Sequence, residues 1–577
     1  MIHNFVEIIR VNMDDKRTLL GFLIIGLIFL LSPYYYEWMG LTPEPEGPAE
    51  SELVESADTV AEPAQDDAQP IEMSSQQTQL KVDSQPIDSS ESNKTQTSES
   101  SFVNRQINVQ TPYLDLIFST EGGLLVSSQL REYNLPDGRP VQLLTPGGRG
   151  LILSLQQLDK ITDLSHIEFV PNREQVKLDE GQETLKLSAQ LGQGRVIEKV
   201  FTFYADHYGF DFEVRYEGFS EDVDAFITWQ GGIAFTEKRP DIDLPEMGAL
   251  ALFNDERMEI KVDDGESETW TDKGILQWAG VRNKYFLSAI IPSEQEGRFR
   301  AVLRGDHKGS SPVPNYSYEV GRQLSLRGSW NNTVYLGPLN YENLTRYSEG
   351  FEQAIDFGWP VINQVSKFIL IVFKKAHNYI PNYGWIIVLF AVVIKIIVYP
   401  LTHKTYESAG KMQELQPKIA ALKEKHKNDN QRLSQETMKL YKEEGVNPLG
   451  GCLPMVLQMP IFMALYNIFG KTIELRQAPF TLWITDLSVP DEVLVAGFGL
   501  HILPLLMSLS MLIQQKMTMK DPKQAFLVYA MPVFMIFIFW SMSSGLVLYW
   551  TLFNVFTIFQ QILVNHFKKD SIPSISR

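Results

Sequence analysis

The chain has 577 residues, of which 44% are hydrophobic, so it is long enough for two or three domains. Its formal net charge of −19 is unevenly spread: residues 40–356 hold 27 Lys and Arg against 53 Asp and Glu, whereas residues 357–577 hold 21 against 13. The acidic middle argues against nucleic-acid recognition, which requires basic surface facing the phosphates. The single cysteine excludes an intramolecular disulfide framework and a cysteine-rich metal site.

The first apolar run, residues 19–31, is preceded by Lys16 and Arg17 and followed by a cluster of aromatic residues at 34–38. This arrangement is typical of a signal peptide or a signal anchor, and the absence of a small-x-small cleavage site favours an uncleaved transmembrane anchor over 19–39. The basic flank places residues 1–18 in the cytoplasm, so the residues beyond the anchor are exported.

Residues 40–104 form an acidic linker. Within it, residues 41–100 have no aromatic residue and carry 14 Asp and Glu against Lys81 and Lys94. Such a segment cannot bury enough apolar surface to offset its chain entropy, so we expect a disordered tether.

Residues 105–350 show the alternation of a β domain. Phe210, Phe212, Val214 and Tyr216 alternate with charged residues, and similar strands are expected at 196–204, 299–303 and 324–326. Turn residues such as those at 137–138 separate the strands. We therefore predict a large exported antiparallel β-sandwich.

An amphipathic helix is predicted over 357–380, where apolar residues at helical spacing (Ile362, Val365, Ile369, Val372 and Ala376) alternate with lysines. We expect it to lie on the outer membrane surface; a further buried span is the alternative.

The last part of the chain, 384–567, reads as a membrane core with spans at 384–401, 450–469, 495–514, 525–541 and 544–565. Together with the anchor, these give six transmembrane helices with both termini in the cytoplasm, in agreement with lysines at 516–523 and in the tail 568–577. The helical patterns within residues 402–447 predict a cytoplasmic helical hairpin. The segment 541–545 is expected to be a tight external turn, the alternative being one long helix.

Lys395 lies near the middle of the first of these spans, GWIIVLFAVVIKIIVYPL. A charge there costs on the order of 3 kcal/mol to insert, so it either snorkels to the inner headgroups or faces a water-filled cavity. Gln458 in the next span likewise requires a partner, either another helix or water.

Other functions fit less well. Ser544-Gly545 lacks the preceding glycine of an intramembrane serine protease, and no phosphate-binding loop or metal-ligand spacing is present, so neither enzymatic activity nor a cofactor or metal is expected. A small-molecule or ion transporter would explain Lys395, but would more naturally show paired acids or an inverted repeat. A periplasmic sugar-binding protein would explain only the β domain.

An ordered series of motifs between residues 384 and 561 resembles the YidC family of membrane protein insertases, the bacterial branch of the Oxa superfamily. The motifs are Tyr399-Pro400-Leu401-Thr402, Lys411-Met412, Leu415-Gln416-Pro417-Lys418-Ile419, Asn447-Pro448-Leu449-Gly450-Gly451-Cys452, Gln458-Met459-Pro460-Ile461-Phe462, Glu474-Leu475-Arg476 with Ala478-Pro479-Phe480, and Ser544-Gly545-Leu546-Val547-Leu548-Tyr549. A weaker match continues upstream at Trp278-Ala279-Gly280, Lys284-Tyr285-Phe286 and Tyr335-Leu336-Gly337-Pro338. The start at Met13-Asp14, with the basic flank and the anchor, also resembles the N-terminus of the family, which implies that Met13 is an alternative start to Met1.

The resemblance implies a five-helix insertase core, a periplasmic β-supersandwich, and insertion and folding of nascent proteins in the bacterial inner membrane. Expected partners are these nascent chains and membrane lipids, the Sec translocon, and the ribosome or signal-recognition receptor. The residues it implies are a hydrophilic substrate groove (Lys395, Gln458, Gln514, Tyr549 and Trp550), a hydrophobic slide (Met459, Phe462, Met463, Phe537 and Ile538) and a docking hairpin (Lys411, Met412, Gln416 and Pro417). Well-studied members carry arginine where this chain has Lys395, so bidentate carboxylate binding is not expected here.

Overall fold

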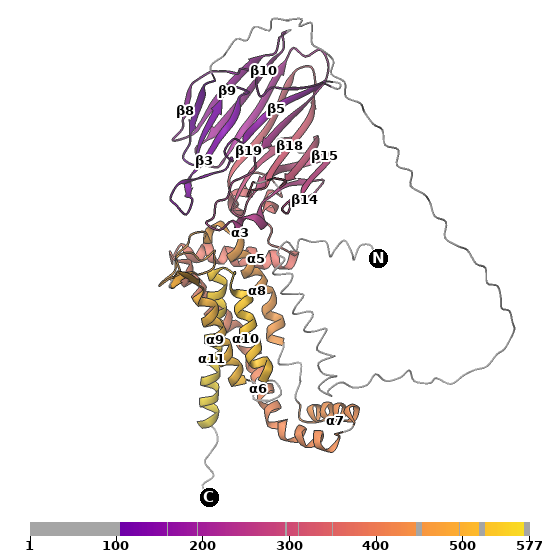
Figure 1. The fold of residues 1–577 in the computed structure, drawn as a ribbon, viewed down its shortest axis with the longest axis vertical. Coiled ribbons are helices and arrows are strands. Elements are labelled where there is room, and N and C mark those ends of the chain that lie inside the picture. Colours follow the sequence, from indigo (N-terminus) through magenta and orange to yellow (C-terminus); the bar gives the residue numbers. More distant parts are fainter. Residues whose placement is uncertain are drawn as a thin grey trace, which may run out of the picture.

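The computed structural model describes residues 104–157, 160–192, 194–294, 297–309, 311–348, 350–427, 429–445, 453–495, 497–518 and 525–570. The predicted cytoplasmic N-terminus, anchor and linker and the motif at 447–452 lie outside these residues. The described chain forms a β-sheet domain at one end and a bundle of helices at the other, with one helix lying crosswise between them (Figure 1).

The β domain consists of two large sheets joined through a shared strand. The first has the order β6 (Lys160–Asp163), β5 (Arg149–Gln157), β12 (Val223–Gln230), β18 (Asn315–Leu324) and β17 (Arg298–Asp306). The second has the order β7 (Val170–Pro171), β9 (Gln182–Gln190), β10 (Val196–Tyr204), β11 (Gly209–Glu217), β19 (Gly328–Pro338), β16 (Phe286–Pro292), β15 (Ser267–Arg282), β13 (Gly248–Phe253) and β14 (Glu256–Ile260). The first half of β15 pairs with β17 and its second half with β13 and β16, so this strand passes from one sheet to the other.

A smaller layer, formed by the N-terminal strands, completes the domain: β8 (Gln175–Lys177), β1 (Gln106–Gln110), β2 (Leu114–Ser119), β3 (Leu124–Asn134) and β4 (Pro140–Gln142). All pairings in the domain are antiparallel except that of β1 with β8. The short helix α3 (Pro240–Asp243) lies at the end nearest the bundle (Figure 1), and the short helix α4 (Tyr341–Leu344) follows β19.

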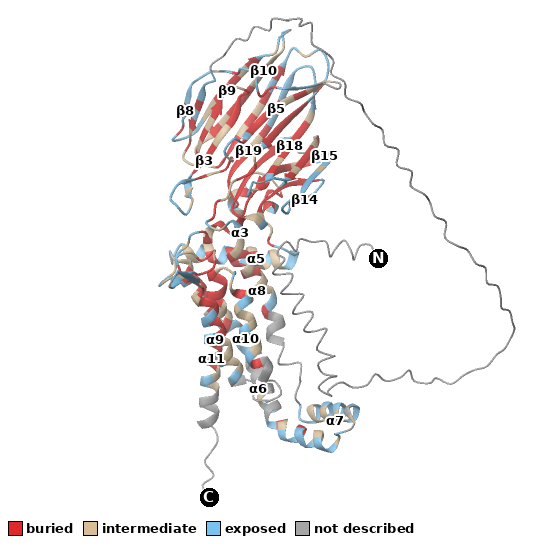
Figure 2. Ribbon diagram, in the orientation of Figure 1, coloured by how far each residue is buried: buried red, intermediate tan, exposed pale blue. Residues whose placement is uncertain are grey.

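The alternation predicted for β11 is confirmed: Phe210, Phe212, Val214 and Tyr216 are buried, and the residues between them are more exposed. Phe201 of β10 stacks on Phe212 with ring centroids 4.9 Å apart. The buried residues of the sheets form one continuous core, which Figure 2 shows as red ribbon along the strands. The strand expected at 324–326 is wrong beyond its first residue, because β18 ends at Leu324 and residues 325–327 connect it to β19.

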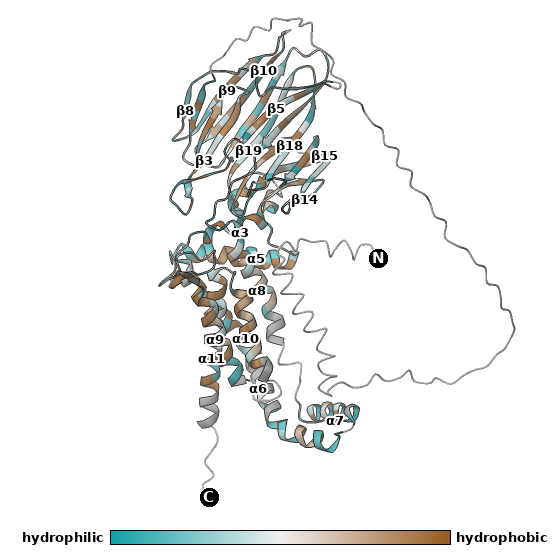
Figure 3. Ribbon diagram, viewed as in Figure 1, coloured by the Kyte–Doolittle hydropathy of each residue, from teal (hydrophilic) through white to brown (hydrophobic). Residues whose placement is uncertain are grey.

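The helical region consists of α5 (Pro360–His377), α6 (Tyr383–Lys425), α7 (Asn430–Glu443), α8 (Leu453–Lys471), α9 (Ile502–Thr518), α10 (Ala525–Phe539) and α11 (Ser544–Asp570). By length and composition, the segments Tyr383–Pro400 and Ser544–Val564 can cross a bilayer, and Ile502–Met517 and Val528–Phe539 are shorter apolar helices. The bundle below α5 is mainly hydrophobic (brown in Figure 3), whereas the hairpin containing α7 carries hydrophilic residues (teal).

The structure departs from two predicted boundaries. The span at 384–401 and the first arm of the hairpin are one helix, because α6 continues through Pro400 and Pro417 to Lys425. The span predicted at 495–514 starts too early: strands β20 (Val493–Val495) and β21 (Phe498–Leu500) form a hairpin, and α9 begins only at Ile502. Gly497 has a φ of 84° at this turn, a conformation that glycine adopts without strain. The prediction of two helices separated near 541–545 is confirmed by the end of α10 and the start of α11.

Helix α5 buries a slightly different face from the one predicted. Ile369 and Phe373 are buried against the bundle, while Val372 is exposed. The predicted stripe followed a 3-4-3 spacing from Ile362 to Val372, but contact with the bundle follows 362, 365, 369, 373 and 376. Val361, Phe368, Ile371 and Val372 are left as an exposed apolar surface.

Candidate functional site

Lys395 is directed into the helix bundle. Ala391 and Val398, one turn before and after it on the same face of α6, are buried, and Lys395 itself is only 9% exposed. Ile396 and Ile397, which point the other way, are about two-thirds exposed. The 3.6-residue period of the helix therefore turns the lysine inward and leaves an apolar face outward.

The partners of Lys395 come from α11. Its Nζ donates a hydrogen bond to Thr557 Oγ1 at 2.6 Å and lies 4.5 Å from the centroid of the Phe553 ring. The Thr557 hydroxyl in turn donates to the backbone oxygen of Phe553 at 2.7 Å, which leaves its lone pairs for the ammonium. In the part of the chain that the structure describes, no carboxylate pairs with Lys395.

Gln458 meets Tyr549 on the same face of α11. Gln458 Nε2 donates to Tyr549 Oη at 2.8 Å, and both side chains are buried. Tyr549, Phe553 and Thr557 follow at four-residue spacing, so they form one stripe along the helix. The Gln458–Tyr549 pair lies about 12 Å along the helix axis from Thr557, with the Phe553 ring between the two levels. Lys395 of α6 and Gln458 of α8 therefore both contact the Tyr549 face of α11. We call this arrangement of Lys395, Gln458, Tyr549, Phe553 and Thr557 the polar stripe.

Trp550 lies apart from that stripe. Its ring packs against Phe462 of α8 and Phe539 of α10, with centroids 5.1 and 6.0 Å away. Consecutive residues of a helix are rotated by about 100°, which places Trp550 on a different face from Tyr549. Gln514 is half-buried on α9. One turn earlier on this helix, Ser510 Oγ accepts a hydrogen bond from Asn554 Nδ2 of α11 at 3.3 Å.

The residues expected to form a hydrophobic slide divide into two groups. Met459 and Phe537 are exposed, by 42% and 74%. Phe462 and Ile538 are half-buried and pack against the bundle core, and Met463 is half-buried. Neighbouring α8 and α10 therefore present apolar side chains to the outside of the bundle.

The predicted docking residues lie on the long extension of α6. Lys411 and Pro417 are exposed and Gln416 is half-buried; the side chain of Met412 lies outside the described residues. Leu415 and Ile419 pack against Leu440 and Tyr441 of α7, and so hold the two arms of the hairpin together. Lys418 pairs with Glu444 across the arms at 2.5 Å.

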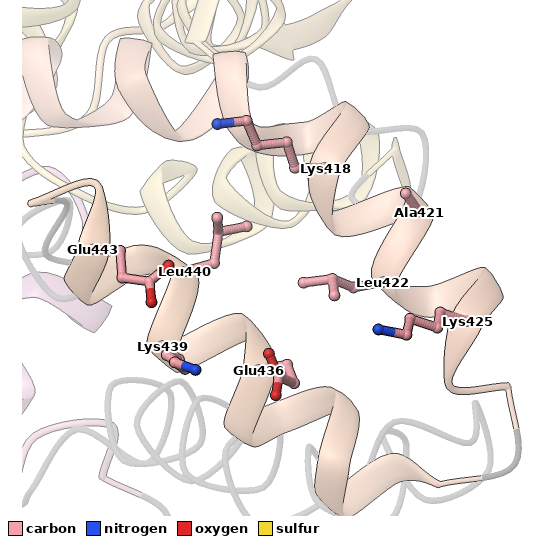
Figure 4. Close-up of a pocket in the computed structure, with 8 residues that line it drawn as sticks. All are labelled: Lys418, Ala421, Leu422, Lys425, Glu436, Lys439, Leu440 and Glu443. Atoms are coloured by element: carbon pink, nitrogen blue, oxygen red, sulfur yellow. The ribbon is translucent and has the colours of Figure 1, made fainter.

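Between the arms lies a cleft of about 340 Å³ (Figure 4). The α6 arm contributes Lys418, Ala421, Leu422 and Lys425, and α7 contributes Glu436, Lys439, Leu440 and Glu443. The two leucines face each other and charges of both signs surround them. This hairpin projects away from the bundle, at the end opposite the β domain.

Phe553 and Thr557 are the site residues that the sequence did not indicate. Phenylalanine and threonine are ordinary residues of apolar helices, so neither stands out as Lys395 does. The available signal was spacing: both lie on the Tyr549 face at successive turns of the helix.

Comparisons with known proteins cover nearly all of the described chain. Residues 106–369 match the family described as YidC periplasmic domain, and residues 375–571 match the 60Kd inner membrane protein family. The membrane protein insertase YidC of Pelobacter propionicus is 35% identical over 486 residues, which cover 81% of this chain and 88% of that protein. That of Chloroherpeton thalassium is 30% identical over 584 residues, covering 96% of each. A crystal structure of an active YidC insertase with its first transmembrane domain resolved aligns at a TM-score of 0.34 and 18% identity, over 80% of this chain and 93% of that one.

Proposed function

Since the chain belongs to the YidC family of membrane protein insertases, we propose that the polar stripe around Lys395 receives the hydrophilic part of a polypeptide during its insertion. The protein is a non-enzymatic membrane protein insertase with a periplasmic domain, and its clients are nascent membrane proteins.

The isolation of Lys395 carries this proposal. Across the five apolar helical segments 383–400, 453–470, 502–515, 525–539 and 544–567, it is the one Lys, Arg, Asp or Glu. Its ammonium is held by a hydroxyl and an aromatic ring, both neutral. Among the described residues Lys395 has no counter-charge, and a buried cation in that state attracts carboxylates more strongly than it would in water, because the local dielectric is lower.

Insertion then proceeds in two stages. An acidic tail of the client enters the stripe from the cytoplasm and approaches Lys395, while Gln458 and Tyr549 supply hydrogen-bonding groups above it. The apolar segment of the client moves along the exposed side chains of α8 and α10, represented by Met459 and Phe537, into lipid. Transfer of apolar groups at about 0.8 kcal/mol per methylene drives this last stage.

The membrane topology of the chain is proposed from the sequence. Six spans with both termini in the cytoplasm of the bacterial inner membrane would leave the β domain in the periplasm and the α6–α7 hairpin in the cytoplasm. The cleft between the hairpin arms (Figure 4), with its two leucines and its mixed charges, is suited to contact with the ribosome, the signal-recognition receptor or the Sec translocon.

The test follows insertion of a short single-span reporter with an acidic exported tail, in bacteria depleted of their own insertase. We expect this chain to restore insertion, Lys395→Ala to lose it and Lys395→Arg to keep it. Lys177→Ala on the exposed β8 is the matched control, because it removes one lysine from the β domain, outside the bundle and the hairpin. If the Lys395→Ala variant restores insertion as well as the parent chain does, the role of the lysine is refuted, while the insertase activity stands. Ion flux through the purified protein would instead favour the transporter.

A further inference from the structure

The β domain meets the membrane helices through a loop formed by residues 472–492, between α8 and β20, which we call the cap loop. Its apolar residues Ile473 and Leu475 are buried, the first in the core of the β domain and the second in that of the bundle. The cap loop is therefore shared between the two cores.

Arg476 is a deeply buried charge of this loop. Its Nε donates to Glu237 Oε1 of the β domain at 2.6 Å, and a terminal nitrogen donates to the backbone oxygen of Thr236 at 3.1 Å. The two charged side chains are 3% and 2% exposed. The guanidinium also lies over the rings of Tyr285 and Phe286, 5.8 and 5.3 Å from their centroids. Removing either partner would leave a charge buried without its counter-charge.

Further polar contacts surround this pair and also cross between the two parts of the chain. Lys471, the last residue of α8, pairs with Glu246 of the β domain at 3.2 Å. Burial would raise the pKa of the Glu246 carboxyl, but Lys471 and Arg282 hold it well below its usual range. Asn340 Nδ2 donates to Glu474 Oε1 at 3.0 Å on another side of the interface.

The cap loop also forms hydrogen bonds with the starts of α6 and α11, two helices that contribute residues to the polar stripe. The backbone nitrogens of Ser544 and Gly545, at the start of α11, donate to loop carbonyls at 2.8 and 2.9 Å. These are groups that a helix N-terminus leaves without intrahelical partners. At the start of α6, Asn382 Nδ2 donates to the carbonyl of Pro479 at 3.2 Å. The loop thus touches the outer ends of the helices that hold Lys395 and Tyr549.

From these contacts we propose that Arg476 is a positioning residue: by binding Glu237 it docks the periplasmic domain on the cap loop, and the loop thereby fixes the outer ends of α6 and α11. The docked domain holds the two helices at the separation at which Lys395 reaches Thr557. The role in insertion rests on the proposed function, whereas docking itself does not.

Docking is measured first, in the full-length protein in membranes, by cross-linking at a different point of the interface. Gln477 Nε2 donates to the backbone oxygen of Asn134 at 3.1 Å, so Asn134→Cys with Gln477→Cys provides a reporter pair once Cys452→Ser has removed the native cysteine. We expect Glu237→Gln and Arg476→Gln each to lower the yield of bismaleimide cross-linking about tenfold. The matched control is Glu183→Gln, because Glu183 forms an exposed pair with Arg173 at 2.7 Å within the β domain.

The double variant Glu237→Leu with Arg476→Leu separates docking from folding. It leaves no lone buried charge, so we expect it to recover cross-linking above either single variant. Resistance of the β domain to trypsin checks in each variant that the sheets remain folded. Single variants that keep their cross-linking with a trypsin-resistant domain would overturn the docking role.

Insertion of the acidic-tailed reporter is measured second, on the same variants. We expect it to fall with cross-linking in the single variants, to recover partly in the double variant, and to be better retained with Arg476→Lys than with Arg476→Gln. Loss of cross-linking with unchanged insertion would overturn the positioning role. If the chain restores no insertion at all, the proposed function fails, while the cross-linking result still decides whether Arg476 docks the domain.

Discussion

Lys199→Met is the substitution whose effect the structure specifies most directly. The Lys199 ammonium is fully buried in the β domain and donates to the backbone oxygens of Gly122, Gly123 and Leu151 at 2.9, 3.1 and 2.9 Å. All three of these residues have positive φ, which for Leu151 is 59°. One cation therefore binds three carbonyls of irregular backbone, one of them at a leucine in a conformation that leucine rarely adopts.

Methionine retains most of the aliphatic stem and removes all three donors. A buried acceptor left without a partner costs about 1–3 kcal/mol, and part of the total is offset because no charge has to be buried. We expect a net loss of about 2–5 kcal/mol in the free energy of unfolding of the β domain. Lys177→Met on the exposed edge of β8 is the control and should change stability by less than about 0.5 kcal/mol.

The pH dependence provides a second measurement on the same variant. Burial lowers the pKa of the Lys199 ammonium to about 7, from an ordinary value of 10.5. Between these two values the unfolded chain binds more protons than the folded one, so the contribution of Lys199 to stability rises with pH, by up to about 1.4 kcal/mol per unit. We expect this rise between pH 7 and 9 in the parent protein and its absence in Lys199→Met.

Pulse proteolysis in urea measures both quantities, because trypsin cuts the β domain only when it is unfolded. A Lys199→Met protein that unfolds within about 0.5 kcal/mol of the parent at pH 7 would refute the reasoning. That result would mean that the three carbonyls find other partners.

Three further predictions concern the helices. Tyr549→Phe removes the acceptor of Gln458 Nε2, so we expect about 1 kcal/mol less stability in a detergent thermal-shift assay and reduced insertion of the acidic-tailed reporter; unchanged values in both would argue against the hydrogen bond. Gly384→Ala would place a Cβ 2.0 Å from the Phe480 ring, so the cap loop must shift at a cost of about 1–3 kcal/mol, which increased trypsin cleavage within 472–492 would reveal. Leu415→Ala removes a buried contact between the hairpin arms and should speed amide exchange in α7 without affecting the β domain.

The sequence by itself determined the class of the protein, because that class depends on local patterns of residues. Alternating apolar residues define β10 and β11, and long apolar runs define α6 and α11. Lys395 and Gln458 could be selected because polar side chains are costly in an apolar helix, whatever surrounds them. Boundaries were less accurate at two places: α6 continues through two prolines, and a β-hairpin replaces the start of a predicted span.

The partners of these residues were decided by the tertiary structure alone. Thr557 lies 162 residues from Lys395, and Glu237 lies 239 residues from Arg476. Neither threonine nor glutamate is unusual where it stands, so nothing in its neighbourhood in the sequence marks it. Periodicity and hydropathy determine which face of an element is buried, but only the packing of distant elements determines which side chains meet across that face.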